Sequence, residues 1–450
     1  MPVGSCAVRV SGIAKVEVDE GIEWRATVQV ADESHELRFG APAELASHAD
    51  ASMFVAACFR PAMAWGQDLE IDGPVSAHLL ARLPILGRHY STMDPGLRPP
   101  EVTAAEAVDD PEPTGHGTAC LLSRGVDSTY SVAVDRVEPA PLDHLLYCRT
   151  LEPHHDPEVS DAELAATRRV ADRVGLPLHV AWTNLRTFTD PMFGWSAMHG
   201  AGLSALGLLV RQRFDTLVIP SAYDLPGTTS TGSHPSLDPL WSTADFRIFH
   251  DLTDRGRHAK VAWLAEHRPE LLAELKVCYS DNASANCGQC HKCLLTMSSL
   301  RAAGALHLAP LFPSELDLEA LRRQRLPGLG RRGLWLPILF AAREVGDDDL
   351  AAAIEDVFRL TAVPTLRELV GGRSRSLDRL LGRVAGPARF APYDPERATT
   401  FETFDRVATD RLLPMVRHGE VPPPGQPPRP GLRPSTVVAS IEASLRHRRR

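Results

Sequence analysis

The sequence has no long apolar run. No stretch reaches the roughly 18 consecutive apolar residues that a membrane-spanning helix requires. The first residues, MPVGSCAVRVSG, lack the charged start, apolar run and cleavage site of a secretory signal. We therefore expect neither a membrane protein nor a secreted one, and the sequence predicts a cytoplasmic protein without a membrane partner.

An excess of positive charge is also missing. Asp and Glu number 57 against 48 for Lys and Arg, which gives a formal net charge of -9. Proteins that bind nucleic acid without sequence preference carry a basic excess. Nucleic acid is therefore not an expected partner, although a local basic patch is compatible with this composition. A length of 450 residues and a hydrophobic content of 44% predict two or three domains with packed cores.

Cysteine is scarce, and its distribution is uneven. Eight cysteines in 450 residues are too few for a disulfide-stapled scaffold. Four of them are scattered among apolar neighbours and are expected to be small buried side chains: Cys6, Cys58, Cys120 and Cys148. The other four lie within sixteen residues: Cys278, Cys287, Cys290 and Cys293.

The clustered cysteines have the spacing of a zinc site. A Cys-x2-Cys turn lets two sulfurs converge on one ion while backbone N–H groups stabilise their charge. Cys287, Cys290 and Cys293 overlap in this spacing, and Cys278 can return across an eight-residue loop as the fourth tetrahedral ligand. Zinc is the expected metal. An iron–sulfur cluster, disulfides, or replacement of one cysteine by His291 stay open as alternatives.

Residues 1–110 predict a small α+β domain. Residues 7–10 and 23–30 alternate apolar and polar side chains as half-buried strands do. The acidic, proline-containing stretch of residues 106–117 has neither a helix nor a strand period. We interpret it as a linker to the next domain.

From residue 116 onward, strands and helices are expected to alternate. Apolar runs predict strands over residues 118–122, 142–148, 178–182 and 216–220. Helices are predicted between them, over residues 128–136, 160–174 and 198–210. Ser160 with Glu163 has the pattern of a capping box, and Gly175 is typical of a helix end. This alternation predicts an α/β fold with a parallel sheet, which binds ligands at the carboxyl ends of its strands.

The C-terminal part of the sequence favours helices. Helical periodicity, as over residues 348–360, predicts a helical region over residues 306–420 with arginine-rich loops such as residues 322–332. Residues 421–450 are dense in proline and end in arginines, a composition typical of disordered or partner-bound segments.

The residues Ser123-Arg124-Gly125-Val126-Asp127-Ser128 lie where a predicted strand gives way to a predicted helix. A loop at this position points backbone N–H groups and the positive end of the helix dipole at one spot, which favours an anion. The serines add hydroxyl donors, and Asp127 can hold Mg²⁺ on a phosphate. The loop is a candidate phosphate site, although such a turn also occurs without a ligand.

This loop resembles the pyrophosphate loop, SGGxDS, of the N-type ATP pyrophosphatases. The cysteine spacing about 150 residues later resembles that of the QueC family, the 7-cyano-7-deazaguanine synthases. The resemblance covers residues 116–305. It implies the adenine nucleotide α hydrolase-like (HUP) fold, a structural zinc knuckle of four cysteines, and binding of ATP and Mg²⁺ by residues 123–128. Arg124 stands where that family has glycine, so its side chain either fills the phosphate pocket or points outward or onto a phosphate oxygen.

The resemblance also implies an activity, that of an ATP-dependent carbon–nitrogen ligase. It would adenylate a carboxylate or amide, release AMP and pyrophosphate, and let ammonia form an amide or nitrile, as with 7-carboxy-7-deazaguanine. Asp127 and Ser128 would act on the phosphates. Asp238 stands about where an aspartate of that family faces the substrate, and His234 lies in the same predicted loop.

Two further groups of residues are open to two interpretations. His199-Gly200, at the start of a predicted helix, suits either an anion or packing. A charged run is predicted to be a solvated helix face, unless some of its cations meet the substrate or the phosphates: Arg247, His250, Asp251, Arg255, Arg257 and Lys260.

Other functions stay open because residues 1–110 and 306–450 have no counterpart in the compact family enzyme. The chain could attach a deazaguanine to a protein in antiphage defence, with the N-terminal domain binding the protein partner. It could insert sulfur, as other pyrophosphatase-loop enzymes do. It could also be a non-catalytic, zinc-containing binding protein.

Overall fold

The computed structural model describes residues 7–46, 50–94, 96–112, 115–149, 151, 157–191, 194–223, 232–251, 253–278, 285–326 and 329–362, with residues 329–332 and 362 in their backbone only. All of them belong to one compact unit of the chain. The predicted helical stretch 363–420, the tail 421–450 and Cys6 lie outside the described residues.

The described strands pair into one ten-stranded sheet in the order β10-β9-β6-β7-β8-β3-β2-β1-β4-β5. The strands are β1 (Ala7–Val18), β2 (Gly21–Val30), β3 (Glu33–Ala41), β4 (Asp68–Ser76), β5 (Val102–Val108), β6 (Thr118–Leu121), β7 (His144–Cys148), β8 (Leu178–Thr183), β9 (Thr216–Ile219) and β10 (Arg247–His250). Most neighbouring strands run parallel, which confirms the predicted α/β class.

Strands β6 to β10 form the parallel half of this sheet. β6 and β9 are buried along their whole length, as expected for strands covered on both faces. The chain runs outward from β6 through β7 and β8, and then returns to place β9 and β10 on the opposite side of β6. The strand order therefore reverses between β6 and β9. Open parallel sheets bind ligands at the carboxyl ends of the strands at such a point.

The N-terminal strands extend the same sheet. β3 pairs antiparallel with β8, where Phe39 lies opposite Thr183 and Gly40 opposite Trp182. A Cβ on Gly40 would lie 2.2 Å from Trp182 Nε1, so only glycine lets the indole lie over the strand. The indole N–H donates to Glu23 Oε1 at 2.9 Å. Strands from both predicted domains thus share one sheet, and the domain boundaries at 110 and 116 stay a prediction.

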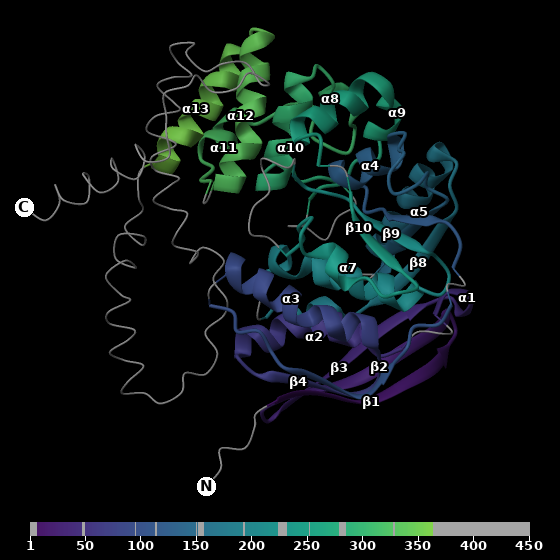
Figure 1. Cartoon of the computed structure of the whole chain (residues 1–450). Helices are drawn as coiled ribbons and strands as arrows, with labels where there is room; N and C mark the ends of the chain where they lie inside the picture. The colour runs from purple at the N-terminus through teal and green to yellow at the C-terminus, as the bar shows by residue number, and fades with distance from the viewer. Residues whose placement is uncertain are drawn as a thin grey trace, which may run out of the picture. The chain divides into compact units, whose positions relative to one another are not determined.

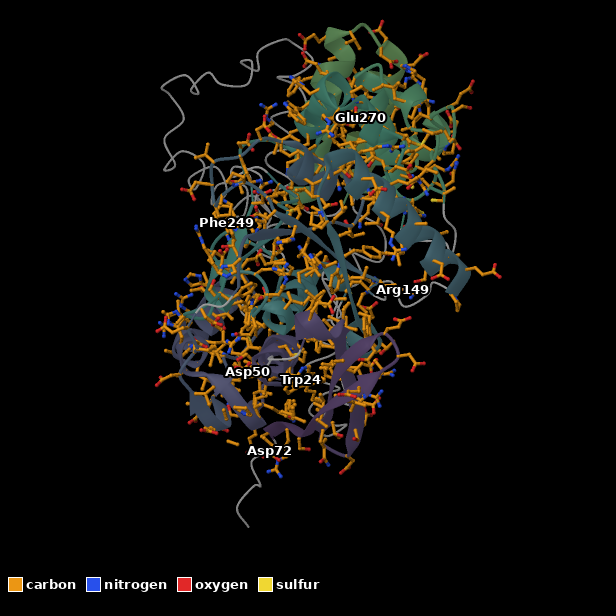
Figure 2. All side chains as sticks on the ribbon, turned by 90° about the vertical axis from the view of Figure 1, so that its right-hand side faces the viewer. Trp24, Asp50, Asp72, Arg149, Phe249 and Glu270 are labelled. Atoms are coloured by element: carbon orange, nitrogen blue, oxygen red, sulfur yellow. The ribbon has the colours of Figure 1, made fainter. Side chains whose placement is uncertain are left out.

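Helices α1 (Ala43–Ala46), α2 (Ser52–Trp65), α3 (Ala77–Met93) and α7 (Trp195–Val210) pack with the N-terminal strands. α2 lies between α7 and the strands β1 and β4 (Figure 1). It is buried over residues 52–63, which is typical of a helix inside a core. Trp24 of β2 donates its indole N–H to the Ala46 carbonyl of α1 at 2.9 Å (Figure 2). One hydrophobic core therefore spans both halves of the sheet.

The remaining described helices are α4 (Val126–Ala133), α5 (Pro157–Val174), α6 (Leu185–Thr189), α8 (Arg257–His267), α9 (Pro269–Leu272), α10 (His291–Ala302), α11 (Leu318–Arg322), α12 (Leu329–Glu344) and α13 (Asp348–Ala362), with the 3-10 helices η2 (Asp238–Trp241) and η3 (Leu306–Leu308). α8 packs against α4 and α10, and α10 packs against α12 (Figure 1). α13 is the helix predicted over residues 348–360.

Several boundaries differ from the sequence predictions. α5 begins at Pro157, so Ser160 lies inside the helix and does not cap it. Proline favours the first position of a helix, because its ring fixes φ near the helical value. β5 continues to Val108, into the predicted linker, because its pairing with β4 uses the backbone and needs no side-chain pattern. The predicted loop 322–332 is partly helical, since α11 ends at Arg322 and α12 begins at Leu329.

A buried arginine joins distant segments of the unit. Arg211 follows α7 and is 3% exposed. Its guanidinium lies 2.9 Å from Asp50 Oδ2, 3.0 Å from Asp110 Oδ1 and 3.5 Å from Asp245 Oδ1. Asp50 lies just before α2 (Figure 2), Asp110 after β5 and Asp245 before β10. Burial raises the pKa of Asp50, so this carboxylate depends on its cation.

We expect Arg211→Ala to lower the free energy of unfolding by about 3–5 kcal/mol, because it leaves buried carboxylates facing one another without their cation. Unfolding in denaturant measures this change. Arg9→Ala is the matched control: it breaks the exposed Arg9–Glu70 pair and is expected to change the stability by less than about 1 kcal/mol. Equal losses in the two variants would contradict the role of the buried cluster.

Candidate functional site

The loop of residues 123–128 connects β6, at the centre of the parallel half, to α4. The helix begins at Val126, two residues before its predicted start, with extended backbone at Gly125. The first N–H groups of a helix have no acceptors within it and carry the positive end of its dipole. Ser123 is exposed, and its N–H donates to Ser128 Oγ at 3.1 Å, which closes the loop. The loop thus presents main-chain donors at the reversal of the strand order, as an anion site requires.

Arg124 does not point outward, which was one of its predicted orientations. Its backbone has a φ of +60°, a conformation in which glycine is usual. Its side chain is 1% exposed: it forms an ion pair with Glu163 of α5 and donates to the Glu274 carbonyl at 3.1 Å. The arginine carbonyl also accepts from the Lys276 N–H at 3.0 Å. The side chain therefore anchors the loop to α5 and to the segment before Cys278.

Asp127 lies in the first turn of α4 and faces two cations of α8. Arg257 Nη2 lies 2.8 Å from Asp127 Oδ2, and Lys260 Nζ lies 3.9 Å from Asp127 Oδ1. Lys260 is fully buried and donates to the Ser221 carbonyl at 2.6 Å. Burial lowers the pKa of Lys260, whereas the nearby Asp127 carboxylate raises it. Two positive groups therefore lie beside the main-chain donors of the loop.

These cations correct the expectation that residues 247–260 form a solvated helix face. The stretch comprises β10, a connection and the start of α8. Asp251 is fully buried and holds Arg136 through two contacts of 2.7 and 3.1 Å. The sequence did contain a signal for the α8 pair, because Arg257 and Lys260 are three residues apart and share one helix face.

The residues of the loop fit Mg²⁺, the metal implied together with ATP. Asp127 Oδ1 is buried and has no hydrogen-bond partner within the described part of the chain. Mg²⁺ in nucleotide enzymes takes one or two protein carboxylates and completes its shell with phosphate oxygens and water. A carboxylate oxygen without a hydrogen-bond partner, 3.9 Å from Lys260 Nζ, lies at the start of α4 and meets that requirement.

Asp238 lies at the predicted edge of the sheet but faces protein groups. It is fully buried and begins η2, and its carboxylate accepts from Ser233 Oγ at 2.5 Å and contacts His250 Nδ1 at 2.7 Å. The His234 N–H lies 3.4 Å from its other oxygen. A Cβ on Gly200 would lie 2.7 Å from this same oxygen, so glycine allows α7 to approach the loop.

The two candidate histidines of this edge make local contacts. His199 Nδ1 lies 3.0 Å from the Ser196 carbonyl, and His234 Nδ1 lies 2.7 Å from Ser236 Oγ. Burial lowers the pKa of both imidazoles, with a smaller effect of the neighbouring His250 in the same direction. His250, which the sequence placed in the charged run, is the histidine that contacts Asp238.

The four clustered cysteines form a potential metal site. Their sulfurs all lie within 4.8 Å of one another, with Cys287 3.8 Å from Cys293 and Cys278 4.0 Å from Cys290. Sulfurs at the corners of a tetrahedron, each about 2.3 Å from one zinc, are about 3.8 Å apart. The separations are too long for disulfides. The adjacent Cys290 sulfur and burial raise the pKa of the Cys293 thiol, and a cation would favour its thiolate.

Local geometry brings these sulfurs together. Gly288 has a φ of +70° and a Cβ there would lie 2.6 Å from Pro313, so the turn requires glycine. The Gln289 and Cys290 N–H groups donate to Cys287 Sγ at 3.4 and 3.3 Å. The Asn286 side chain accepts from the N–H groups of residues 277 and 278. These two bonds hold the segment that ends at Cys278 beside the turn that carries the other three cysteines.

The cysteine segment contacts the phosphate loop on one side and helix α8 on the other. Lys276, two residues before Cys278, bonds to Arg124 as described above. On the other side, Cys293 lies in α10, where Ser299 Oγ contacts His258 Nδ1 of α8 at 2.8 Å. His258 lies between Arg257 and Lys260 in the sequence. The metal site and the cations beside Asp127 are therefore parts of one packed arrangement.

Three other cysteines are buried, as predicted: Cys58, Cys120 and Cys148. Burial raises the pKa of the Cys58 and Cys120 thiols, which keeps them protonated. His291, the alternative ligand, does not belong to the cluster of potential ligands within the described residues, and its ring lies 6.1 Å from that of Trp335.

Comparison with family models, with curated proteins and with solved structures gives no match for this chain. Among the described residues, no helix combines the length and the apolar character needed to cross a membrane. The fold and site thus define an α/β protein with a potential four-cysteine metal centre. The family resemblance drawn from the two motifs stays a prediction.

Proposed function

We propose that this chain is an ATP-dependent ligase of the ATP pyrophosphatase type. It binds the phosphates of ATP at residues 123–128, adenylates a carboxylate and releases pyrophosphate. The observation that carries the proposal is the convergence of Arg257, Lys260 and the first turn of α4 at the point where the strand order reverses. Cations and main-chain donors at this position suit a polyphosphate.

The residues of the site have separate tasks in this proposal. Main-chain N–H groups of the loop and the Ser123 hydroxyl hold the phosphate oxygens. Arg257 and Lys260 offset the negative charge that accumulates on pyrophosphate as it leaves. Asp127 keeps both cations in place, and its free oxygen would hold Mg²⁺, which supplies further positive charge to the phosphates. Arg124 positions the loop from behind through Glu163.

The carboxylate substrate and its amine are the finer part of the proposal. Resemblance to the QueC family favours 7-carboxy-7-deazaguanine and ammonia, which yield an amide and, after a second activation, a nitrile. AMP leaves far more readily than hydroxide, so adenylation lowers the barrier to amide formation. Two other reactions stay predictions for the same adenylating site: attachment of a deazaguanine to a protein in antiphage defence, and insertion of sulfur into a substrate.

The metal of the four-cysteine site is proposed to be zinc in a structural role. Four sulfur ligands complete a tetrahedral shell and leave no position for a reacting water. An iron–sulfur cluster would place several iron and sulfide atoms between the cysteine sulfurs. The sulfurs would then be further apart than they are here, where all lie within 4.8 Å of one another. Elemental analysis with one zinc per chain is the expected result, and iron would contradict it.

The test of the ligase proposal is nucleotide binding followed by turnover. We expect calorimetry to detect binding of a non-hydrolysable ATP analogue in the presence of Mg²⁺. We expect AMP and pyrophosphate to appear when Mg-ATP, ammonium and 7-carboxy-7-deazaguanine are supplied. Binding with turnover on a different carboxylate would keep the reaction class and change the substrate. Absence of any binding would overturn the proposal and favour a non-catalytic binding protein.

A further inference from the structure

Three side chains beside the phosphate loop form a hydrogen-bonded chain. Ser221 follows β9, His250 ends β10 and Asp238 begins η2. Ser221 Oγ lies 3.0 Å from His250 Nε2, and His250 Nδ1 lies 2.7 Å from Asp238 Oδ2. These distances, in this order of atoms, are those of a serine nucleophile, its histidine base and the carboxylate that orients the base.

The carboxylate determines how the imidazole can act. Ionised Asp238 only accepts hydrogen bonds, so His250 donates from Nδ1 and its Nε2 presents a lone pair to Ser221 Oγ. Ser233 Oγ donates to the same carboxylate oxygen at 2.5 Å and holds it in place. Ser221 Oγ also lies 2.7 Å from the Tyr223 carbonyl, so its hydrogen has one resting acceptor besides the base.

Lys260 connects this chain to the phosphate loop. Its ammonium donates to the Ser221 carbonyl at 2.6 Å and lies 3.9 Å from Asp127 Oδ1. A nucleophilic serine is therefore separated from the carboxylate of the loop by one lysine head group. Ser221 is 1% exposed, so acyl transfer to its hydroxyl requires the groups that cover it to move.

We propose that Ser221 takes the acyl group from the acyl adenylate, with His250 as its base and Asp238 as a positioning residue. This inference rests on the proposed adenylation. Ser221 Oγ attacks the acyl carbon and gives its proton to His250 Nε2. The bond from that carbon to the AMP oxygen breaks, and AMP leaves with the electron pair, so the product is an acyl ester on Ser221.

The amine then resolves the ester. Ammonia attacks the ester carbon, the bond to Ser221 Oγ breaks, and the imidazolium of His250 returns a proton to that oxygen. The new amide nitrogen loses one proton, first to His250 and then to solvent. Acyl adenylate and ammonia are thus converted to amide, AMP and one proton, and no oxidant or reductant is needed.

A fluorophosphonate probe tests the nucleophile without knowledge of the substrate. Attack by Ser221 on phosphorus expels fluoride and leaves the probe on the serine oxygen. With the full-length, zinc-loaded protein we expect labelling, which peptide mass spectrometry assigns to Ser221 and which Ser221→Ala abolishes. Ser299 is an internal control and should carry no label. Its hydroxyl contacts His258 Nδ1, but among the contacts described no carboxylate holds the other nitrogen of that imidazole. A folded wild-type protein without label on Ser221 would overturn the proposal.

Variants of the base and of its carboxylate separate their roles. His250→Gln should slow labelling at least about 100-fold, as loss of a general base does. Asp238→Asn should slow labelling, because an amide does not hold the imidazole as a carboxylate that accepts from His250 Nδ1 does. Asp238→Glu should recover part of the rate, since it restores a carboxylate. Equal labelling rates in Asp238→Asn and Asp238→Glu would limit Asp238 to a structural role and contradict its positioning role.

The acyl transfer and the adenylation can fail separately. With an accepted carboxylate, Ser221→Ala should keep exchange of labelled pyrophosphate into ATP and lose amide formation by at least about 100-fold. Amide formation at the wild-type rate would overturn the acyl ester. The protein could also bind no ATP while Ser221 still reacts with the probe. That result would support Ser221 as a nucleophile, and it would overturn both the ligase proposal and the acyl adenylate as the donor.

Discussion

Loss of the metal from the four-cysteine site is expected to unfold the segment around α10 and to abolish nucleotide binding with it. Structural zinc contributes on the order of 10 kcal/mol to the folding of small sites. Here four sulfurs from both ends of the segment would share one ion, and without it the thiolates repel one another or must be protonated. α10 holds α8 through the contact of Ser299 with His258, so Arg257 and Lys260 should lose their positions as well.

Cys290→Ser and treatment with a strong chelator are the two ways to measure this. We expect loss of zinc by elemental analysis, a lower melting temperature, faster hydrogen exchange over residues 285–302, and weaker binding of an ATP analogue. Cys148→Ala is the matched control, because it alters a buried cysteine outside the cluster and should keep the zinc content. A protein that loses its metal with unchanged melting temperature would show that the site does not hold the segment.

The second large effect is expected at Lys260. Lys260→Met should weaken binding of an ATP analogue by roughly 10–100-fold, because a hydrogen bond from a charged donor to a phosphate at the proposed site would contribute about 1.5–3 kcal/mol. The loss should occur with and without Mg²⁺, since in the proposed site the ammonium contacts the phosphates without the metal between them. Isothermal calorimetry measures both conditions.

Asp127→Asn tests the same site by removing a negative charge, whereas Lys260→Met removes a positive one. Binding of the metal-free analogue to Asp127→Asn should therefore stay or improve, whereas Mg-ATP turnover should fall by about 100–1000-fold. Arg247→Met is the control and should leave nucleotide binding unchanged. This arginine of β10 is exposed, and its guanidinium carbon lies 4.9 Å from the ring centre of Phe249. Equal losses in Lys260→Met and Arg247→Met would point to a general charge effect and contradict a specific site.

The buried position of Asp238 shows where sequence pattern and structure differ. The sequence left two roles open for this loop residue: contact with a substrate at the ligand edge of the sheet, and local hydrogen bonds within the turn. In the fold, Gly200 lets α7 approach, Ser233 and His250 occupy the carboxylate oxygens, and the side chain is fully buried. Whether a loop carboxylate meets solvent or another side chain depends on what packs over it, and local spacing does not contain that information.

The sequence by itself determined the features that depend on near neighbours in the chain. Apolar runs and helical periods predicted the strands β6 to β9 and the helices α4, α5 and α7, whereas β10 was not predicted. Cysteine spacing predicted the metal cluster, since all ligands but Cys278 lie close together in the chain. Gly175 ends α5 with a φ of +73°, as its position predicted.

Only the tertiary structure decided which distant residues meet. The single sheet arises because β3 pairs with β8 across more than a hundred residues, and backbone pairing leaves no mark in the side-chain pattern. Arg124 reaches Glu163, Lys260 reaches Asp127, and Ser221 reaches His250 for the same reason. The sequence gives the charge of each residue but not its partner. The partner depends on the packing that brings the carboxyl ends of β6, β9 and β10 together.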